Sequence, residues 1–175
     1  MSRARATVGG MVELTDDVLV AAPADAVWHD VTDPASIAEW FWPERMDPHA
    51  EVEPVPGGVW SVSSDPAGMA VDATIVGLEP PNTLRLQWRW RGEEAVTEVE
   101  VSLDPITASG ALGRTSIDPD LSKDASGSTR STRVRVVHSG FTDEVDRDNH
   151  VQGWADCLQR LVERHGPPAA SGDDS

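Results

Sequence analysis

The sequence contains very little of several residue types, and each shortage excludes a class of protein. Cys157 is the only cysteine among 175 residues, so neither an intramolecular disulfide nor a multi-cysteine metal site can form. No stretch approaches the ~20 apolar residues of a membrane span, and the apolar run at 18–22 stops at Pro23. The first thirty residues also lack the apolar run of a signal peptide, so we expect a cytoplasmic location.

Positive charge is also scarce. Lys and Arg total 14 against 30 Asp and Glu, which gives a formal net charge of −16, and Lys123 is the only lysine. A chain with this charge repels phosphate backbones and anionic headgroups, so we expect neither a nucleic acid nor a membrane as a partner. Tyrosine is absent, and seven of the nine aromatic residues are tryptophan. The length suits a single domain.

Three segments lack apolar periodicity and set the predicted domain limits. Residues 1–11 are expected to form a flexible arm, and the Pro-, Gly- and Asp-rich tail at 166–175 is expected to be disordered. Residues 105–130 are rich in Gly, Ser, Asp and Thr, and they predict a long flexible insertion between the last two strands. The stretch after residue 130 is too short to fold alone, so we predict one domain over 12–165.

Between these segments, apolar residues alternate in a strand-like manner and then change to a helical period. The alternation predicts strands at 13–21, 59–63, 69–78, 83–91, 95–103 and 131–139. Two short helices are expected at 24–31 and 34–40, the second with Asp33 as its cap, and a Pro-rich spacer at 43–56. From about 143 to 165 the apolar residues recur every 3.6 positions, which predicts one long amphipathic helix.

Two neighbouring strands also suggest how they pair. If residues 92–94 form the turn between them, Trp88 lies opposite Val99 and Arg89 lies opposite Glu98. This register pairs apolar with apolar and positive with negative side chains, and a slip of one residue would lose both matches. Further along, Thr132, Val134, Val136 and His138 are expected on the inner face of the last strand.

The element order favours an α+β fold. It consists of a curved antiparallel sheet of about six strands, with two short helices after the first strand and a long C-terminal helix packed across the sheet. Because such a sheet twists and curls around the helix, a concave space can open between the two layers.

Several short motifs occur in order along residues 13–165. They are APADAVW at 22–28, TDP at 32–34, AEWF at 38–41, GGVW at 57–60, TRV at 132–134, HSGF at 138–141 and GW at 153–154. In this order they resemble the START/birch-pollen-allergen-like helix-grip (SRPBCC) superfamily. More closely, they resemble the branch named after the C-terminal domain of the activator of heat-shock protein 90 ATPase. The 105–130 segment is longer than this branch usually carries at that place.

The resemblance implies a helix-grip fold and a cavity for a hydrophobic or amphipathic small molecule. The branch name implies co-chaperone work, and a few superfamily members are cyclase- or hydrolase-like enzymes. In the eukaryotic co-chaperone a separate N-terminal domain supplies much of the chaperone contact, and we expect no room for it here, so ligand binding is the preferred interpretation over co-chaperone work. The oligomeric state is left open.

The candidate ligand-binding residues are those expected to face the space between sheet and helix. They are Trp60, Trp88, Trp90, Val101, Val136, His138, His150 and Trp154. The tryptophans would form a wall for a flat apolar ligand and the histidines would be polar anchors at its rim. The alternative, which we favour for the residues taken singly, is that the histidines are satisfied structural groups and the tryptophans fill the core. Trp42 is expected to be exposed at an entrance gate.

No pattern for a catalytic, metal or cofactor site stands out. Cys157 falls on the apolar stripe of the long helix, which indicates a buried inert thiol. The five histidines show no paired metal-ligand spacing, and neither a Gly-x-Ser-x-Gly nor a nucleotide-binding glycine motif occurs. The leading hypothesis is therefore non-catalytic binding of a small molecule. The alternatives are a chaperone interaction module that uses an exposed Trp42, and an enzyme with His138 or His150 as general acid–base.

Overall fold

The structure is a computed structural model that describes residues 7–8, 11–106 and 131–166. The strands are β1 (Thr7–Val8), β2 (Met11–Val20), β3 (Pro48–Val52), β4 (Val59–Ser64), β5 (Met69–Glu79), β6 (Thr83–Trp90), β7 (Thr97–Ile106) and β8 (Ser131–Phe141). The helices are α1 (Ala24–Thr32), α2 (Pro34–Trp40) and α3 (Glu144–His165), with the 3-10 helix η1 (Glu44–Met46) ahead of β3.

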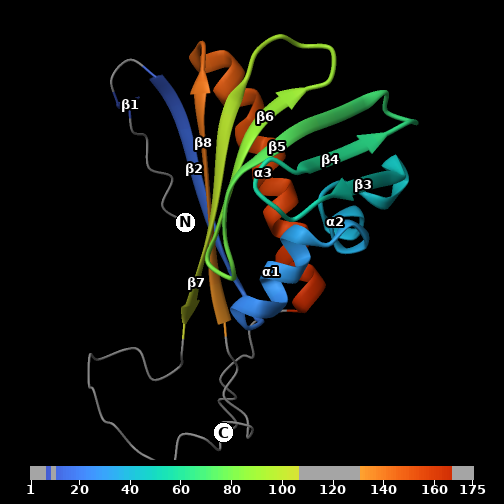
Figure 1. Cartoon of the computed structure of the whole chain (residues 1–175), viewed down its shortest axis with the longest axis vertical. Helices are drawn as coiled ribbons and strands as arrows, with labels where there is room; N and C mark the ends of the chain where they lie inside the picture. Colours follow the sequence, from blue (N-terminus) through green and yellow to red (C-terminus); the bar gives the residue numbers. More distant parts are fainter. Residues whose placement is uncertain (1–6, 9–10, 107–130, 167–175) are drawn as a thin grey trace, which may run out of the picture.

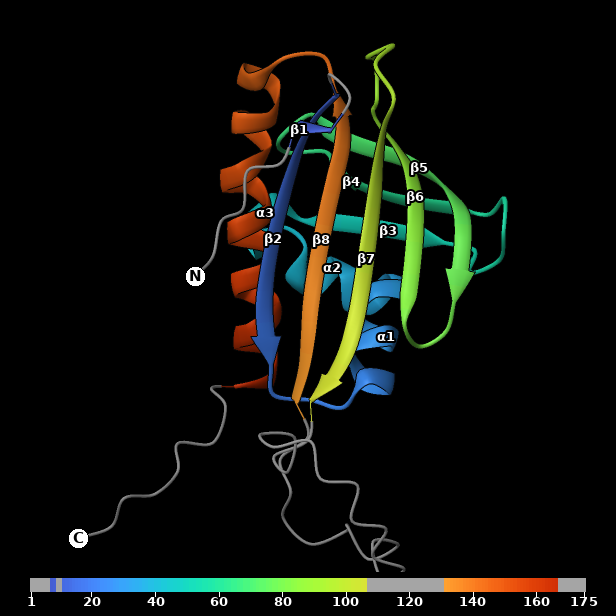
Figure 2. The same cartoon turned by 90° about the vertical axis from the view of Figure 1, so that its left-hand side faces the viewer.

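All the described strands join one antiparallel sheet in the order β1-β2-β8-β7-β6-β5-β4-β3. Figure 1 shows this sheet curving around α3, with α1 and α2 beside the C-terminal end of that helix. In Figure 2 the long strands β2, β8 and β7 run side by side, and α3 lies next to β2. The curved sheet and the helix across it confirm the predicted α+β helix-grip architecture.

The sheet has more strands than the sequence suggested. β3 lies inside the expected Pro-rich spacer, and it escaped prediction because its alternation is short, with only Ala50 and Val52 after Pro48 on the apolar side. β1 pairs with the start of β2, through Thr7 opposite Val12 and Val8 opposite Met11, within the segment expected to be an arm. The other residues of that arm, residues 107–130 of the expected insertion and residues 167–175 of the expected tail lie outside the described residues.

The pairing of β6 with β7 corrects the predicted register by two residues. Trp88 lies opposite Thr97, and Val99 lies opposite Leu86. The prediction was wrong because the pairing stops at Trp88 and Thr97, so that residues 89–96 connect the paired ends and more of them belong to β6 than a symmetric turn would use. Trp90, at the end of β6, pairs only with Val71 of β5. A shift of two residues preserves the side-chain alternation, so Trp88 and Val99 are both buried on the inner face as expected.

The same shift changes the ion pair on the outer face. Glu98 lies opposite Gln87 and does not meet Arg89. Instead Arg85 lies opposite Glu100, and its Nε donates to the Glu100 carboxylate over 2.8 Å. Both side chains of this pair are exposed, so water and salt screen their attraction.

Local capping explains where the helices begin. The side chain of Asp33 accepts from the backbone N–H of Ser36, and Pro34 comes next, at the first helical position of α2. The Asp143 side chain accepts from the N–H of Asp146 at the start of α3 in the same way. Gly166 then ends α3 with a positive φ of 78°, a conformation that glycine adopts without steric penalty.

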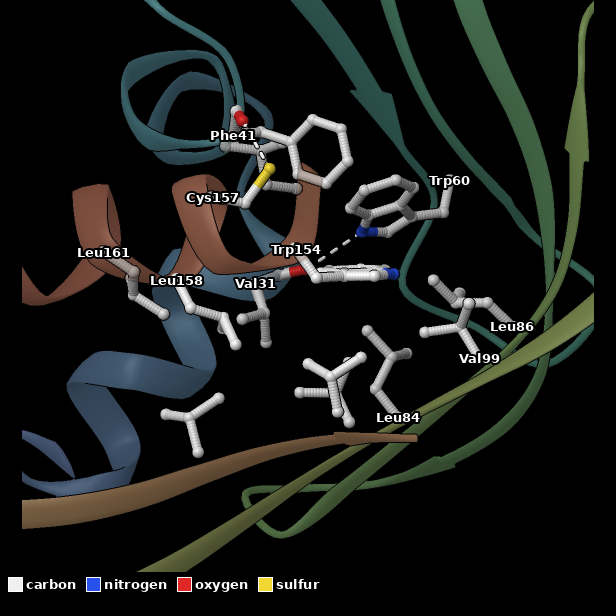
Figure 3. Close-up of a cluster of buried hydrophobic side chains, with 14 of the residues drawn as sticks. Val31, Phe41, Trp60, Leu84, Leu86, Val99, Trp154, Cys157, Leu158 and Leu161 are labelled. Carbon is white, nitrogen blue, oxygen red and sulfur yellow. Dashed lines mark hydrogen bonds between the residues drawn. The ribbon is translucent and has the colours of Figure 1, made fainter. Parts of the chain in front are cut away.

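The hydrophobic core fills most of the space between α3 and the sheet. Figure 3 shows Trp154, Leu158 and Leu161 of α3 facing apolar side chains of the strands. A residual void of about 20 Å³ remains among Val31, Trp60, Leu84, Val101, Val136, Leu158 and their neighbours. Such a void has room for about one water molecule, so this part of the interior is solid.

Candidate functional site

A much larger pocket opens at the other end of the space between sheet and helix. Its volume is about 540 Å³, which falls within the range of small-molecule sites. The walls come from the segment after α2, the start of β5, the end of β6 with its following turn, and the N-terminal half of α3. The lining residues are Phe41, Trp42, Gly68, Met69, Ala70, Trp88, Trp90, Arg91, Glu93, Asp146, Asn149, His150, Gly153, Trp154 and Cys157.

Aromatic rings form the apolar part of the pocket wall. Trp88 and Trp90 both lie on the inner face of β6, because side chains two residues apart on a strand share a face. Trp42 stacks on Trp90, with ring centroids 6.3 Å apart and planes 9° apart. Trp154 of α3 closes against Trp88 with centroids 5.5 Å apart. Four tryptophans therefore surround one pocket.

The position of Trp42 corrects a prediction. Its side chain is only 8% exposed, so it is a buried wall of the pocket, not an exposed surface residue. The stacking partner Trp90 lies 48 positions further along the chain, and no local pattern indicates that contact. The hypothesis of a chaperone module needed an exposed Trp42 as its contact surface, and the buried side chain does not provide one.

His150 holds Trp90 in place. The indole Nε1–H of Trp90 donates to Nε2 of His150 over 2.8 Å. Since Nε2 accepts, the ring proton sits on Nδ1, which is 2.8 Å from the backbone carbonyl oxygen of Asp146 and donates to it. Both ring nitrogens are thus occupied, and the histidine fixes the orientation of the pocket wall.

His138 holds Trp154 in a similar way from behind the wall. The indole Nε1–H of Trp154 donates to Nδ1 of His138 over 3.0 Å, and His138 Nε2 lies 2.7 Å from the hydroxyl oxygen of Thr97. His138 is fully buried, and this burial, with a smaller contribution from His150, lowers the pKa of His138 to about 3. The ring therefore stays neutral near pH 7, with no free nitrogen for proton transfer.

Cys157 and Arg160 attach the Phe41 segment to α3. The thiol of Cys157 donates to the carbonyl oxygen of Phe41 over 2.8 Å, and Arg160 donates to the same oxygen and to that of Trp40. Burial raises the pKa of the Cys157 thiol to about 12, so the thiolate is not populated at neutral pH. The thiol is buried and inert, as its place on the apolar stripe indicates.

The charged residues and one amide side chain sit at the mouth of the pocket. Asp146 and Asn149 come from the start of α3, and Arg91 and Glu93 come from the turn after β6. Arg91 is bound to Asp72 by two hydrogen bonds, of 3.0 Å from Nε and 2.7 Å from Nη2. The hydrogen bonds from Arg91 lower the pKa of Asp72 in return. The pocket therefore combines an aromatic interior with a polar rim.

The structure brings half of the sequence-derived candidates to this pocket. Trp88, Trp90, His150 and Trp154 line it, whereas His138 lies behind Trp154. The remaining three, Trp60, Val101 and Val136, surround the small core void. Phe41 and Trp154 line both spaces and separate one from the other.

Sequence reasoning missed several wall residues because they come from loops and element ends. Phe41 comes directly after α2, and Met69 and Ala70 begin β5 next to a turn. The sequence predicts Trp42 at an entrance, but as an exposed residue, whereas it is buried. Gly153 could have been found from the sequence, because a glycine inside a helical pattern costs stability and usually has a packing or functional reason.

Neither a metal centre nor a membrane-spanning helix is found in the described residues. No group of three or more His, Cys, Asp or Glu side chains there is placed to hold a metal ion. Nor does any helix in the same ranges have the length and apolar character needed to cross a membrane.

Comparison with known proteins places the fold. The chain is similar to protein MLL2253 from Mesorhizobium loti, with 20% identity and a TM-score of 0.64 over 86% of this chain and 94% of that one. It is also similar to CalU16 from Micromonospora echinospora, with 21% identity and a TM-score of 0.63 over 97% and 86% of the two chains. The Aha1 dimer from Colwellia psychrerythraea matches at 17% identity and a TM-score of 0.62, over 91% and 99%. No curated protein matches the chain.

A family model gives the more specific assignment. The model described as "Activator of Hsp90 ATPase homolog 1-like protein" matches residues 21–166, which is most of the chain and runs from the end of β2 to the end of α3. The solved structures share the helix-grip fold at identities that support the architecture alone. The chain therefore belongs to the family of Activator of Hsp90 ATPase homolog 1-like proteins, within the helix-grip superfamily.

Proposed function

We propose that this protein binds a hydrophobic or amphipathic small molecule in the aromatic pocket, without catalysing its conversion. The observation that carries the proposal is the pocket of about 540 Å³ walled by Trp42, Trp88, Trp90 and Trp154. Small-molecule sites are typically concave and mostly apolar, with a few placed polar groups, and this pocket has that composition.

The hydrogen bonding of the walls supports a site formed in advance. His150 fixes the indole of Trp90, and His138 fixes that of Trp154. Arg160 and Cys157 hold the backbone on which Phe41 and Trp42 are carried. A wall that is ordered before binding loses little conformational entropy on binding, which favours affinity.

The test uses N-phenyl-1-naphthylamine, a neutral apolar dye whose emission rises in apolar surroundings, with the full chain. We expect saturable binding to the wild type and its loss in Gly153→Trp, because the position of Gly153 opens onto the pocket with no atom within 4 Å of a Cβ placed there. The matched control is Gln159→Trp, which adds the same side chain to an exposed position of α3. Equal binding by both variants, or no binding by the wild type, would overturn the proposal.

The family assignment favours one second candidate, a co-chaperone-like module. The experiment is a pull-down against the heat-shock protein 90 homologue of the host, with its ATPase turnover as the readout. Stimulation by Gly153→Trp as strong as by the wild type would assign that activity to a surface other than the pocket.

A further inference from the structure

The charges around the pocket select among the amphipathic ligands that its apolar walls would admit. We infer that the ligand is an organic cation, an amine carried on a flat apolar body. The inference rests on the proposed function, since it assigns the chemical class of the molecule bound in the same pocket. Three features of the lining carry it: a neutralised arginine, two carboxylates, and the faces of several indole rings.

The only arginine or lysine among the lining residues that the structure describes is not available to an anionic ligand. Arg91 gives its Nε and Nη2 hydrogens to the two carboxylate oxygens of Asp72. Asp72 lies in the outward-facing alternation of β5, together with exposed Thr74 and Val76, so this pairing draws the guanidinium away from the pocket. An anionic ligand would have to break a bidentate ion pair to reach it.

The N-terminus of α3, the other place where an anion could be held, is already occupied. The side chain of Asp143 accepts the N–H of Asp146 and places its own negative charge at the helix start. Glu144 and Asp146 add two more carboxylates in the first turn. An anionic ligand bound there would be repelled by all three carboxylates.

Asp146 and Glu93 supply the negative charge at the mouth. Both line the pocket, one from α3 and the other from the turn after β6, so they approach the opening from two sides. The nearest cationic candidate to Asp146 is His150, at 3.6 Å from Oδ1, but its Nδ1–H already donates to the Asp146 carbonyl oxygen and its Nε2 accepts from Trp90. Both imidazole nitrogens are therefore used in other hydrogen bonds, and neither is directed at the Asp146 carboxylate. Since Arg91 is bound to Asp72, the described pocket lining offers no free arginine or lysine to the two carboxylates.

The aromatic walls also attract a positive charge. The faces of indole rings carry negative electrostatic potential, and a cation within about 6 Å of such a face is attracted, most strongly by tryptophan. Trp42 and Trp90 stack nearly parallel, and Trp88 stands perpendicular to Trp90 with centroids 6.2 Å apart. A ligand amine between these rings and the two carboxylates would meet favourable partners on several sides.

The experiment compares three probes that share one ring system: 1-naphthylmethylamine as the cation, 1-naphthylmethanol as the neutral form and 1-naphthylacetate as the anion. Each displaces N-phenyl-1-naphthylamine from the full chain at pH 7 and low salt. We expect the cation to bind about tenfold more tightly than the anion, with the alcohol between them. Added salt should narrow this difference.

Charge-neutralising variants then test the origin of the preference. Asp146→Asn and Glu93→Gln should each weaken binding of the cation about twofold to fivefold, and weaken binding of the alcohol less. Glu94→Gln is the matched control, since Glu94 lies in the same turn but does not line the pocket. If the three probes bind equally, or if the control has the same effect as the two variants, the charge inference is wrong while the pocket function stands. If no probe competes with the dye, the proposed function itself fails.

Discussion

Gly153 offers a test of both the fold and the pocket at one position. It lies inside α3 with helical neighbours on both sides, and it faces the pocket. A Cβ built at this position meets no atom within 4 Å, so an alanine would fit without displacing any neighbour. Glycine inside a helix is less favourable than alanine by about 0.8–1.0 kcal/mol, because it loses more backbone entropy on folding.

Gly153→Ala should therefore raise the free energy of unfolding by about 1 kcal/mol. For a domain of this size, that gain corresponds to an increase in Tm of about 2–4 °C. Thermal and urea denaturation followed by far-UV circular dichroism measure both quantities. The single methyl group should leave dye binding nearly unchanged, in contrast to the tryptophan at the same position.

Gly68→Ala is the matched control. Gly68 also lines the pocket and also has open space around a built Cβ, but its φ is +62°, which disfavours any residue with a side chain. This variant should lose about 1 kcal/mol of stability. A fall in Tm for Gly153→Ala would mean that α3 packs against other atoms at this point, and the assignment of an open pocket there would be wrong.

Other predictions concern titration, reactivity and the sheet surface. The pKa of His138 is about 3 in the folded chain against 6.5 for the free group, so the unfolded chain binds the extra proton between these values. The free energy of unfolding should keep its full value above pH 6.5 and fall by about 2 kcal/mol by pH 5, and urea titrations of His138→Gln should lack that part of the fall. Cys157 should react with Ellman's reagent at pH 8 only after denaturation, and rapid labelling of the native chain would contradict its burial. Glu100→Gln should change the free energy of unfolding by less than about 1 kcal/mol, because the ion pair with Arg85 is exposed; a larger loss in urea denaturation would show an interaction that the structure lacks.

Much of the fold is predictable because it depends on local patterns. The alternation in β6 and β8 places the inner faces correctly, and the long apolar stripe places α3 within a residue or two of its observed ends. Asp33 and Pro34 mark the start of α2 through a cap that the structure confirms. Each of these signals lies within a few residues of the element it specifies.

The errors arise where distant segments or loop geometry decide the outcome. The register of β6 and β7 depends on which residues form the last pair before the turn, and composition alone does not show that this pair is Trp88 and Thr97. Trp42 sits next to Pro43 and a polar segment in the sequence, which suggests exposure, whereas stacking on Trp90 buries it. The site is a product of such long-range contacts, so only half of the candidate residues reach it.

The two histidines illustrate how far residue-level reasoning extends. From the sequence, His138 and His150 are expected either to anchor a ligand or to be satisfied structural groups. Their ring nitrogens bind the indoles of Trp154 and Trp90, so each is satisfied and at the same time orients a pocket wall. The identity of these hydrogen-bond partners depends on the packing of α3 against the sheet, which no sequence spacing encodes.

The side chains of Phe41 and Trp154 separate the pocket from the core void and so set how deep the pocket is. One side of this partition faces the open pocket and the other faces the small void in the core. A smaller residue at either position would connect the two spaces and extend the hollow toward Leu158 and Leu161. Under the proposed function, the length of ligand that the pocket accepts would therefore depend on these two rings, with the sheet and helices unchanged.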